Sequence, residues 1–244
     1  MENQEKNYNA DLKKLYNDYW KGLKEIKKND CRFSEPWLMK LIPEYGKKPR
    51  LFVIGQEALN CCGGSDVDKL MNEYFRFRKE EVGKSYHPPF WRAIRYLENR
   101  LDLNVEDCSA VSNLIRLDPF AQDPKKEKTD QFGIYEQTPE LINISKIMLQ
   151  KEIEICNPNL IIFFTGPYYE QFMPEIFKKC DWETLESGDY VDSANRKKEY
   201  WLKKSNIAEF NCPVYWTWHP KHLDSCTAPI RDKILNRIVK DFKD

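Results

Sequence analysis

Four short apolar segments alternate with amphipathic helical patterns along the chain. Leu51–Ile54 ends at Gly55, and Leu160–Phe164 ends at Thr165 and Gly166. The other two lie in "CSAVSNLIRLDP" (108–119) and "CPVYWTWHP" (212–220). Short apolar runs bounded by turn residues are typical of strands buried in a parallel sheet. We therefore expect four such strands.

Helical spacing of apolar residues separates these strands. It covers 10–29, Phe90–Arg100, about 139–156 and a C-terminal segment from Ile230 onward. Strands that alternate with helices predict a three-layer α/β/α fold with a central, mostly parallel four-stranded sheet. No linker rich in Pro, Gly or Ser divides the chain. We expect an N-terminal helical extension over 1–45, packed on the body, and one α/β domain over 46–244.

Two polar stretches interrupt this alternation. Residues 61–89 contain glycines and many charges, which indicates a loop with a short helix. Residues 180–211 are strongly polar and predict a small antiparallel addition.

The charge and cysteine content narrow the class of protein. Lys and Arg number 39, as do Asp and Glu, so the net charge is zero. Nucleic-acid binding would then depend on a local basic face, or would be weak. The eight cysteines form no CxxC pair, which argues for reduced thiols rather than a metal cluster. The N-terminal segment lacks the apolar core of a secretory signal, and no run is long enough to span a membrane, so we expect a cytoplasmic protein without a membrane partner.

Polar side chains follow the predicted strands. Because the carboxyl ends of parallel strands meet at one edge, these residues are candidates for one site. They are Gln56, Glu57, Asn60, Asn113, Thr165, His219 and His222. Structural roles are the alternative for each: Gln56 and Glu57 as caps, Asn113 as a satisfied buried amide, and His219 bonded to the backbone.

A zinc site is a further alternative. His219, His222 and Cys226 are spaced by three and four residues and would share a helical face. Pro220 stands between the histidines, and no carboxylate or second cysteine pair completes the set at a spacing familiar from zinc sites. The sequence contains no GxSxG elbow, no P-loop and no GxGxxG after the first strand, which argues against serine hydrolases and common nucleotide-binding folds.

An ordered series of five motifs resembles the uracil-DNA glycosylase superfamily. In chain order these are "VIGQEALN", "PPFWRAIRYL", "SNLIRLDP", "NPNLIIFFTGP" and "TWHPKHL". The resemblance covers about residues 50–242. It implies a domain of that fold over 46–244 and a hydrolase that cleaves the N-glycosidic bond of uracil or another deaminated base in DNA, single- or double-stranded, with no cofactor.

The resemblance also implies a role for each matching residue. Two would be catalytic: Glu57 would position water, and His219 would donate a hydrogen bond to the departing base. The base would be held by Gly55, Gln56, Phe90 and Asn113, with Phe90 stacking on its face and Asn113 reading its edge. Lys221 and Asn60 would contact DNA.

Several positions depart from the family pattern. Ala58 and Leu59 stand where the family has proline and tyrosine, Glu57 is longer than the usual aspartate, and Lys221 replaces a serine. These departures leave an alternative open: a catalytically weak or inactive module that binds nucleic acid, a nucleotide or a protein partner.

Overall fold

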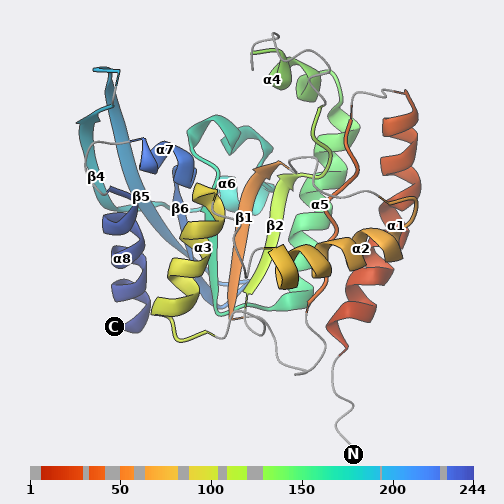
Figure 1. The fold of residues 1–244 in the computed structure, drawn as a ribbon, viewed down its shortest axis with the longest axis horizontal. Helices are drawn as coiled ribbons and strands as arrows, with labels where there is room; N and C mark the ends of the chain where they lie inside the picture. The colour runs from red at the N-terminus through yellow and green to blue at the C-terminus, as the bar shows by residue number, and fades with distance from the viewer. Residues whose placement is uncertain are drawn as a thin grey trace, which may run out of the picture.

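A single mixed sheet with strand order β2-β1-β3-β6-β5-β4 organises the structure (Figure 1). The computed structural model describes residues 7–29, 33–41, 50–57, 64–81, 88–103, 109–119, 129–192, 194–225 and 230–244. Four neighbouring strands are parallel. They are β2 (Ser109–Ile115), β1 (Leu51–Glu57), β3 (Leu160–Phe164) and β6 (Cys212–Thr217). The predicted parallel strands and their α/β class are thus confirmed.

The sheet has six strands, so the expectation of four was wrong. β4 (Glu183–Val191) and β5 (Lys197–Ile207) form an antiparallel hairpin, and β5 extends the sheet by pairing antiparallel with β6. Residues 180–211 do form the antiparallel addition expected. Its strands carry few apolar residues because β4 is an edge strand with most positions at least partly exposed. The apolar-run criterion, which finds strands buried on both faces, does not detect such a strand.

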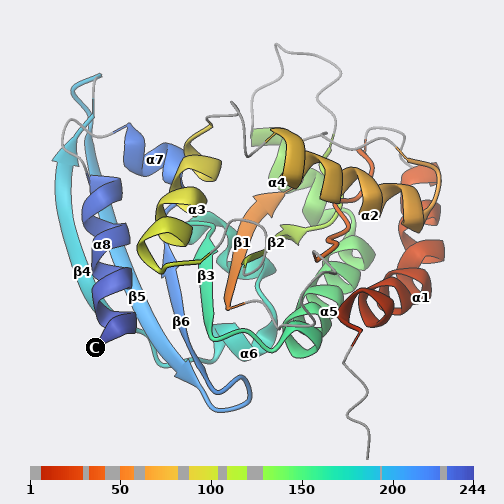
Figure 2. The same cartoon turned by 60° about the horizontal axis from the view of Figure 1, so that its bottom comes forward.

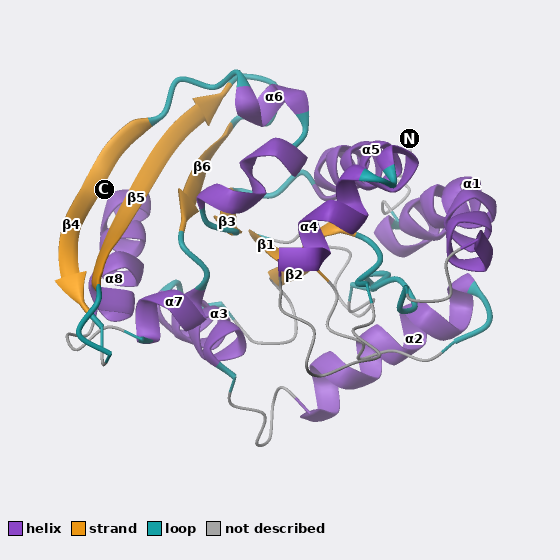
Figure 3. Ribbon diagram, turned by 90° about the horizontal axis from the view of Figure 1, so that it is seen from above, coloured by secondary structure: helices purple, strands orange, loops and turns teal. Residues whose placement is uncertain are grey.

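Helices cover both faces of the sheet. In Figure 3, α3, α7 and α8 lie on one side, and α5 and α6 lie on the other. The long helices match the predicted patterns: α1 (Tyr8–Asn29), α3 (Pro89–Arg100), α5 (Pro139–Cys156) and α8 (Ile230–Lys243). The shorter elements are α2 (Val67–Arg76), a π-helical turn η2 (Phe77–Glu81), α4 (Thr129–Glu136), a 3₁₀ segment η3 (Pro167–Phe172), α6 (Glu175–Lys178) and α7 (Pro220–Asp224).

A buried ion pair ties α1 and α5 to the sheet. Nη2 of Arg116, just after β2, lies 2.6 Å from Oε2 of Glu152 on α5, and both side chains are buried. Tyr16 of α1 donates its hydroxyl to Oε1 of Glu152 at 2.7 Å, and Ser112 of β2 donates to Oε2. The charges are compensated inside the core, and the bond from Tyr16 joins α1 to α5, beside which it lies in Figure 2.

None of the described helices combines the length and apolar character that crossing a membrane requires.

Candidate functional site

Gly55, Asn113 and Phe90 meet at the carboxyl edge of the parallel strands. Gly55 near the end of β1 pairs in register with Asn113 of β2. A β-carbon added at Gly55 would lie 2.5 Å from Oδ1 of Asn113 and 3.2 Å from Cζ of Phe90, in the first turn of α3. Only glycine leaves room for this approach of an amide and an aromatic ring.

His219 adds an imidazole to the same group. Its ring lies parallel to that of Phe90, with centroids 5.6 Å apart and an interplanar angle of 8°. His219 is the N-cap of α7, where its Nδ1 accepts the backbone N–H of Lys221 at 3.1 Å. Since Nδ1 is an acceptor, the proton of the neutral ring resides on Nε2. The short helix thereby fixes His219 as an Nε2–H donor.

Glu57, at the end of β1, is held by a buried phenol. The hydroxyl of Tyr169 donates a hydrogen bond to Oε2 of Glu57. Burial, and the nearby Glu57 carboxylate, raise the pKa of Tyr169 far above its usual value, so the phenol stays protonated and remains a donor. Tyr169 belongs to η3 and packs against Phe132 and Phe172. The carboxylate is therefore oriented by an aromatic cluster outside β1.

Gln56 has a structural partner. Its Nε2 donates to the backbone oxygen of Thr165 at 2.9 Å, which joins the ends of β1 and β3. The hydroxyl of Thr165 in turn accepts the indole N–H of Trp216 at 3.1 Å. The side chain of Gln56 thus supports the strand edge, a structural role that differs from the cap considered for this residue.

The surroundings of Lys221 contain a small cluster of charges. Lys221 is exposed on α7. On the same helix, Asp224 forms ion pairs with Arg92 of α3 and with Nη1 of Arg231 of α8, the latter at 2.9 Å. Arg231 also pairs with Asp232. The charges of Asp224 and Asp232 are thus paired with those of Arg92 and Arg231.

His222 occupies a different environment from His219. Its ring stacks on Trp218, with centroids 4.0 Å apart, and its Nε2 lies 2.9 Å from the hydroxyl of Tyr190 and 3.2 Å from the backbone oxygen of Glu199. Burial lowers the pKa of His222. These contacts fit a packed, neutral histidine that braces α7 against the β4–β5 hairpin.

The structure describes two of the three residues of the zinc alternative, His219 and His222. Cys226 lies outside the described residues, as do Asn60, Ala58, Leu59 and His87. Within the described part of the chain, no group of three or more His, Cys, Asp or Glu side chains is arranged to hold a metal ion.

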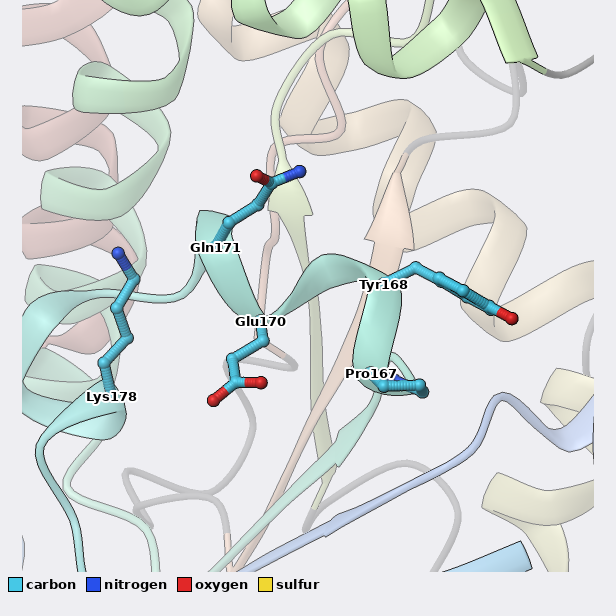
Figure 4. A pocket seen from close by; sticks show the side chains of 5 residues that line it. All are labelled: Pro167, Tyr168, Glu170, Gln171 and Lys178. Carbon is cyan, nitrogen blue, oxygen red and sulfur yellow. The ribbon is translucent and has the colours of Figure 1, made fainter. Parts of the chain in front are cut away.

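A shallow hollow of about 480 Å³ opens beside η3 (Figure 4). It is lined by Pro167, Tyr168, Glu170, Gln171 and Lys178. The hollow is separate from Gly55, Phe90 and Asn113, none of which lines it.

Tyr169 and Arg92 were not among the residues predicted from the sequence. Tyr169 lies in "GPYYEQF", which matches no catalytic motif, and its contact with Glu57 spans 112 positions. Arg92 is one of many charged residues on an amphipathic helix. Only the folded arrangement distinguishes either one.

No protein-family model matches this chain, and a search of curated proteins returned no match.

Proposed function

We propose that this protein hydrolyses the N-glycosidic bond of uracil or another deaminated base in DNA, as a divergent member of the uracil-DNA glycosylase superfamily. The observation that carries the proposal is the meeting of the Asn113 amide and the Phe90 ring over Gly55, with His219 parallel to Phe90. These groups come from four segments far apart in the sequence. An aromatic face, an amide and an imidazole donor are the groups that binding and releasing a nucleobase require.

Phe90 and Asn113 account for recognition of the base. A base that has left the stack would lie against the Phe90 ring, since every base offers a π-face. The amide of Asn113 can donate and accept in one plane, so it complements the acceptor and donor edge of uracil and mismatches the reversed edge of cytosine. The absence of a side chain at Gly55 lets Asn113 and Phe90 approach each other over the strand backbone, and so places the two groups that would hold the base.

His219 supplies the electrostatic step. When the glycosidic bond breaks, the base leaves with the bonding electron pair and carries negative charge. A neutral Nε2–H donor, preorganised by the bond from Lys221 N to Nδ1, stabilises that charge without first giving up a proton.

Glu57 serves the sugar side of the reaction. The oxocarbenium-like sugar is positive, and a carboxylate both stabilises it and orients the water that adds to C1′. The hydrogen bond from Tyr169 keeps this carboxylate in one orientation. The exposed ammonium group of Lys221, on the same helix as Asp224, is the proposed contact to DNA phosphates.

The test uses oligonucleotides that contain one uracil, hypoxanthine or xanthine, as single strands and as duplexes. Alkali treatment after incubation reveals abasic sites as strand breaks. Wild type should give strand breaks at the modified position only, and His219→Ala should give no strand breaks. Lys24→Ala, a change on the distant helix α1, is the control and is purified in the same way. Breaks that persist at the wild-type level in His219→Ala would reject the proposal; no breaks from any substrate would leave a binding module as the remaining alternative.

A further inference from the structure

The segment that follows β3 carries an aromatic side chain with an unusual exposure. Tyr168 is 68% exposed, and Val191 is the only other large hydrophobic residue counted as exposed within the described part of the chain. The next residue, Tyr169, is buried and holds Glu57. At this edge of the sheet, the side chain of Tyr168 therefore faces solvent and that of Tyr169 faces the core.

The backbone beneath Tyr168 is held firmly. Gly166 has a φ of 68°, which favours glycine, and its N–H donates to the backbone oxygen of Thr217 at 3.0 Å. The ring of Pro167 fixes its own φ angle, and the buried side chains of Tyr169 and Phe172 anchor η3 in the core. The exposed ring thus stands on a rigid support, which lowers the entropy lost when a ligand stacks on it.

The orientation of Tyr168 leaves its ring available. It contacts Trp218 with centroids 6.0 Å apart and an interplanar angle of 74°, so the two rings do not lie flat on each other. Figure 4 shows the side chain of Tyr168 pointing away from Glu170, Gln171 and Lys178. Trp218 directly precedes His219, which brings Tyr168 to the same edge as the proposed base site.

We propose that Tyr168 is a stacking platform for a base that neighbours the target nucleotide, and that single-stranded DNA is the preferred partner. The choice of ligand rests on the proposed glycosylase function. Bases of a single strand are free to stack on an aromatic ring, whereas bases of a duplex already stack on each other. The zero net charge of the chain supports a partner held by stacking more than by phosphate neutralisation.

The hollow beside Tyr168 provides a path for the strand to continue. Lys178 offers an ammonium group and Gln171 an amide along its lining, and Glu170 adds a carboxylate that repels phosphate. Lys178 also pairs with Glu175 at 2.9 Å, so its contribution to phosphate binding is small. Stacking on Tyr168 remains the dominant contact.

Binding is measured by fluorescence anisotropy with an oligothymidylate strand that contains no uracil, so the result does not depend on excision. A second strand with the same phosphates but base-free sugars reports backbone binding alone. Wild type should bind the oligothymidylate more tightly than the base-free strand or the matching duplex. Tyr168→Ala should raise Kd for oligothymidylate by about 5- to 150-fold, and Tyr168→Trp should preserve affinity.

Val191→Ala is the matched control, because it removes the other exposed apolar side chain from a distant edge strand. It should leave Kd unchanged. The inference is overturned if wild type does not bind, if it binds base-free or duplex DNA as tightly, or if Tyr168→Ala binds like wild type. His219→Ala separates the two proposals: it should slow excision by roughly 10²- to 10³-fold and keep the Tyr168-dependent binding. Binding without excision in wild type would reject the enzyme and keep the platform.

Discussion

The side-chain oxygen of Asn113 lies 2.5 Å from the position that a β-carbon of Gly55 would occupy. This fit between a glycine of β1 and an amide of β2 sets the position of Asn113, and the ring of Phe90 closes the same space at 3.2 Å. A single methyl group is therefore a sensitive probe of the site.

Gly55→Ala should displace Asn113 or Phe90 and reduce excision at least tenfold, and the overpacking should lower the free energy of unfolding by about 1–3 kcal/mol. Urea unfolding and the abasic-site assay measure the two effects. Gly133→Ala is the matched control, since a β-carbon there meets no atom within 4 Å. Its helix α4 should gain up to about 1 kcal/mol. Full activity in Gly55→Ala would mean that Asn113 and Phe90 need not keep these positions.

Tyr169→Phe should separate orientation of Glu57 from recognition of the base. Loss of the phenol donor removes the hydrogen bond that orients the Glu57 carboxylate, so excision in the abasic-site assay should slow. The affinity for uracil-free DNA should not change. Excision at the wild-type rate would show that the reaction does not need the hydrogen bond from Tyr169 to Glu57.

His222 gives a pH dependence of stability that is independent of catalysis. Its folded-state pKa is lowered by burial, so the unfolded chain binds the proton more readily, and the stabilisation present above about pH 6.5 is lost as the pH falls below it. Urea unfolding should show a larger loss of stability between pH 7.5 and pH 5 in wild type than in His222→Phe. Equal losses would show that His222 is not held neutral by its burial on Trp218.

Glu152→Gln should destabilise the fold strongly, because it leaves the Arg116 guanidinium buried without its counter-charge. Breaking such a pair by removing one partner costs about 3–5 kcal/mol. Lys14→Ala breaks an exposed pair with Asp18 and should cost at most about 1 kcal/mol. Similar unfolding midpoints for the two variants would mean that the buried pair tolerates loss of its charge.

The sequence predicted the parts of the fold that depend on apolar patterns. β1, β2, β3 and β6 are largely buried and appear as short apolar runs, interrupted in β2 by Ser112 and Asn113, and α5 keeps its helical period. The sequence did not predict β4 as a strand of the main sheet, because "ETLESGDYV" is largely polar. Its backbone hydrogen bonds with β5, rather than burial of apolar side chains, hold this strand in the sheet.

The candidate site was predictable only as a set of residues. Parallel strands bring their carboxyl ends to one edge, which is why Glu57, Asn113 and His219 could be grouped from their positions alone. The partners that orient them were not visible, because the contact of Tyr169 with Glu57 and that of Gln56 with Thr165 depend on where η3 and β3 pack. Asn60 lies outside the described residues, and its role stays a prediction.

The most direct test of the proposed glycosylase function is single-turnover release of free base from oligonucleotides that contain uracil, hypoxanthine or xanthine. The released base is measured by chromatography. Wild type should release one of these bases and leave an equal amount of abasic DNA. His219→Ala, which lacks the donor to the departing base, should be slower by roughly 10²- to 10³-fold, and Asn113→Asp, which replaces the amide donor by an acceptor of equal size, should lose uracil release. No free base from wild type, or release at the wild-type rate by both variants, would contradict the account.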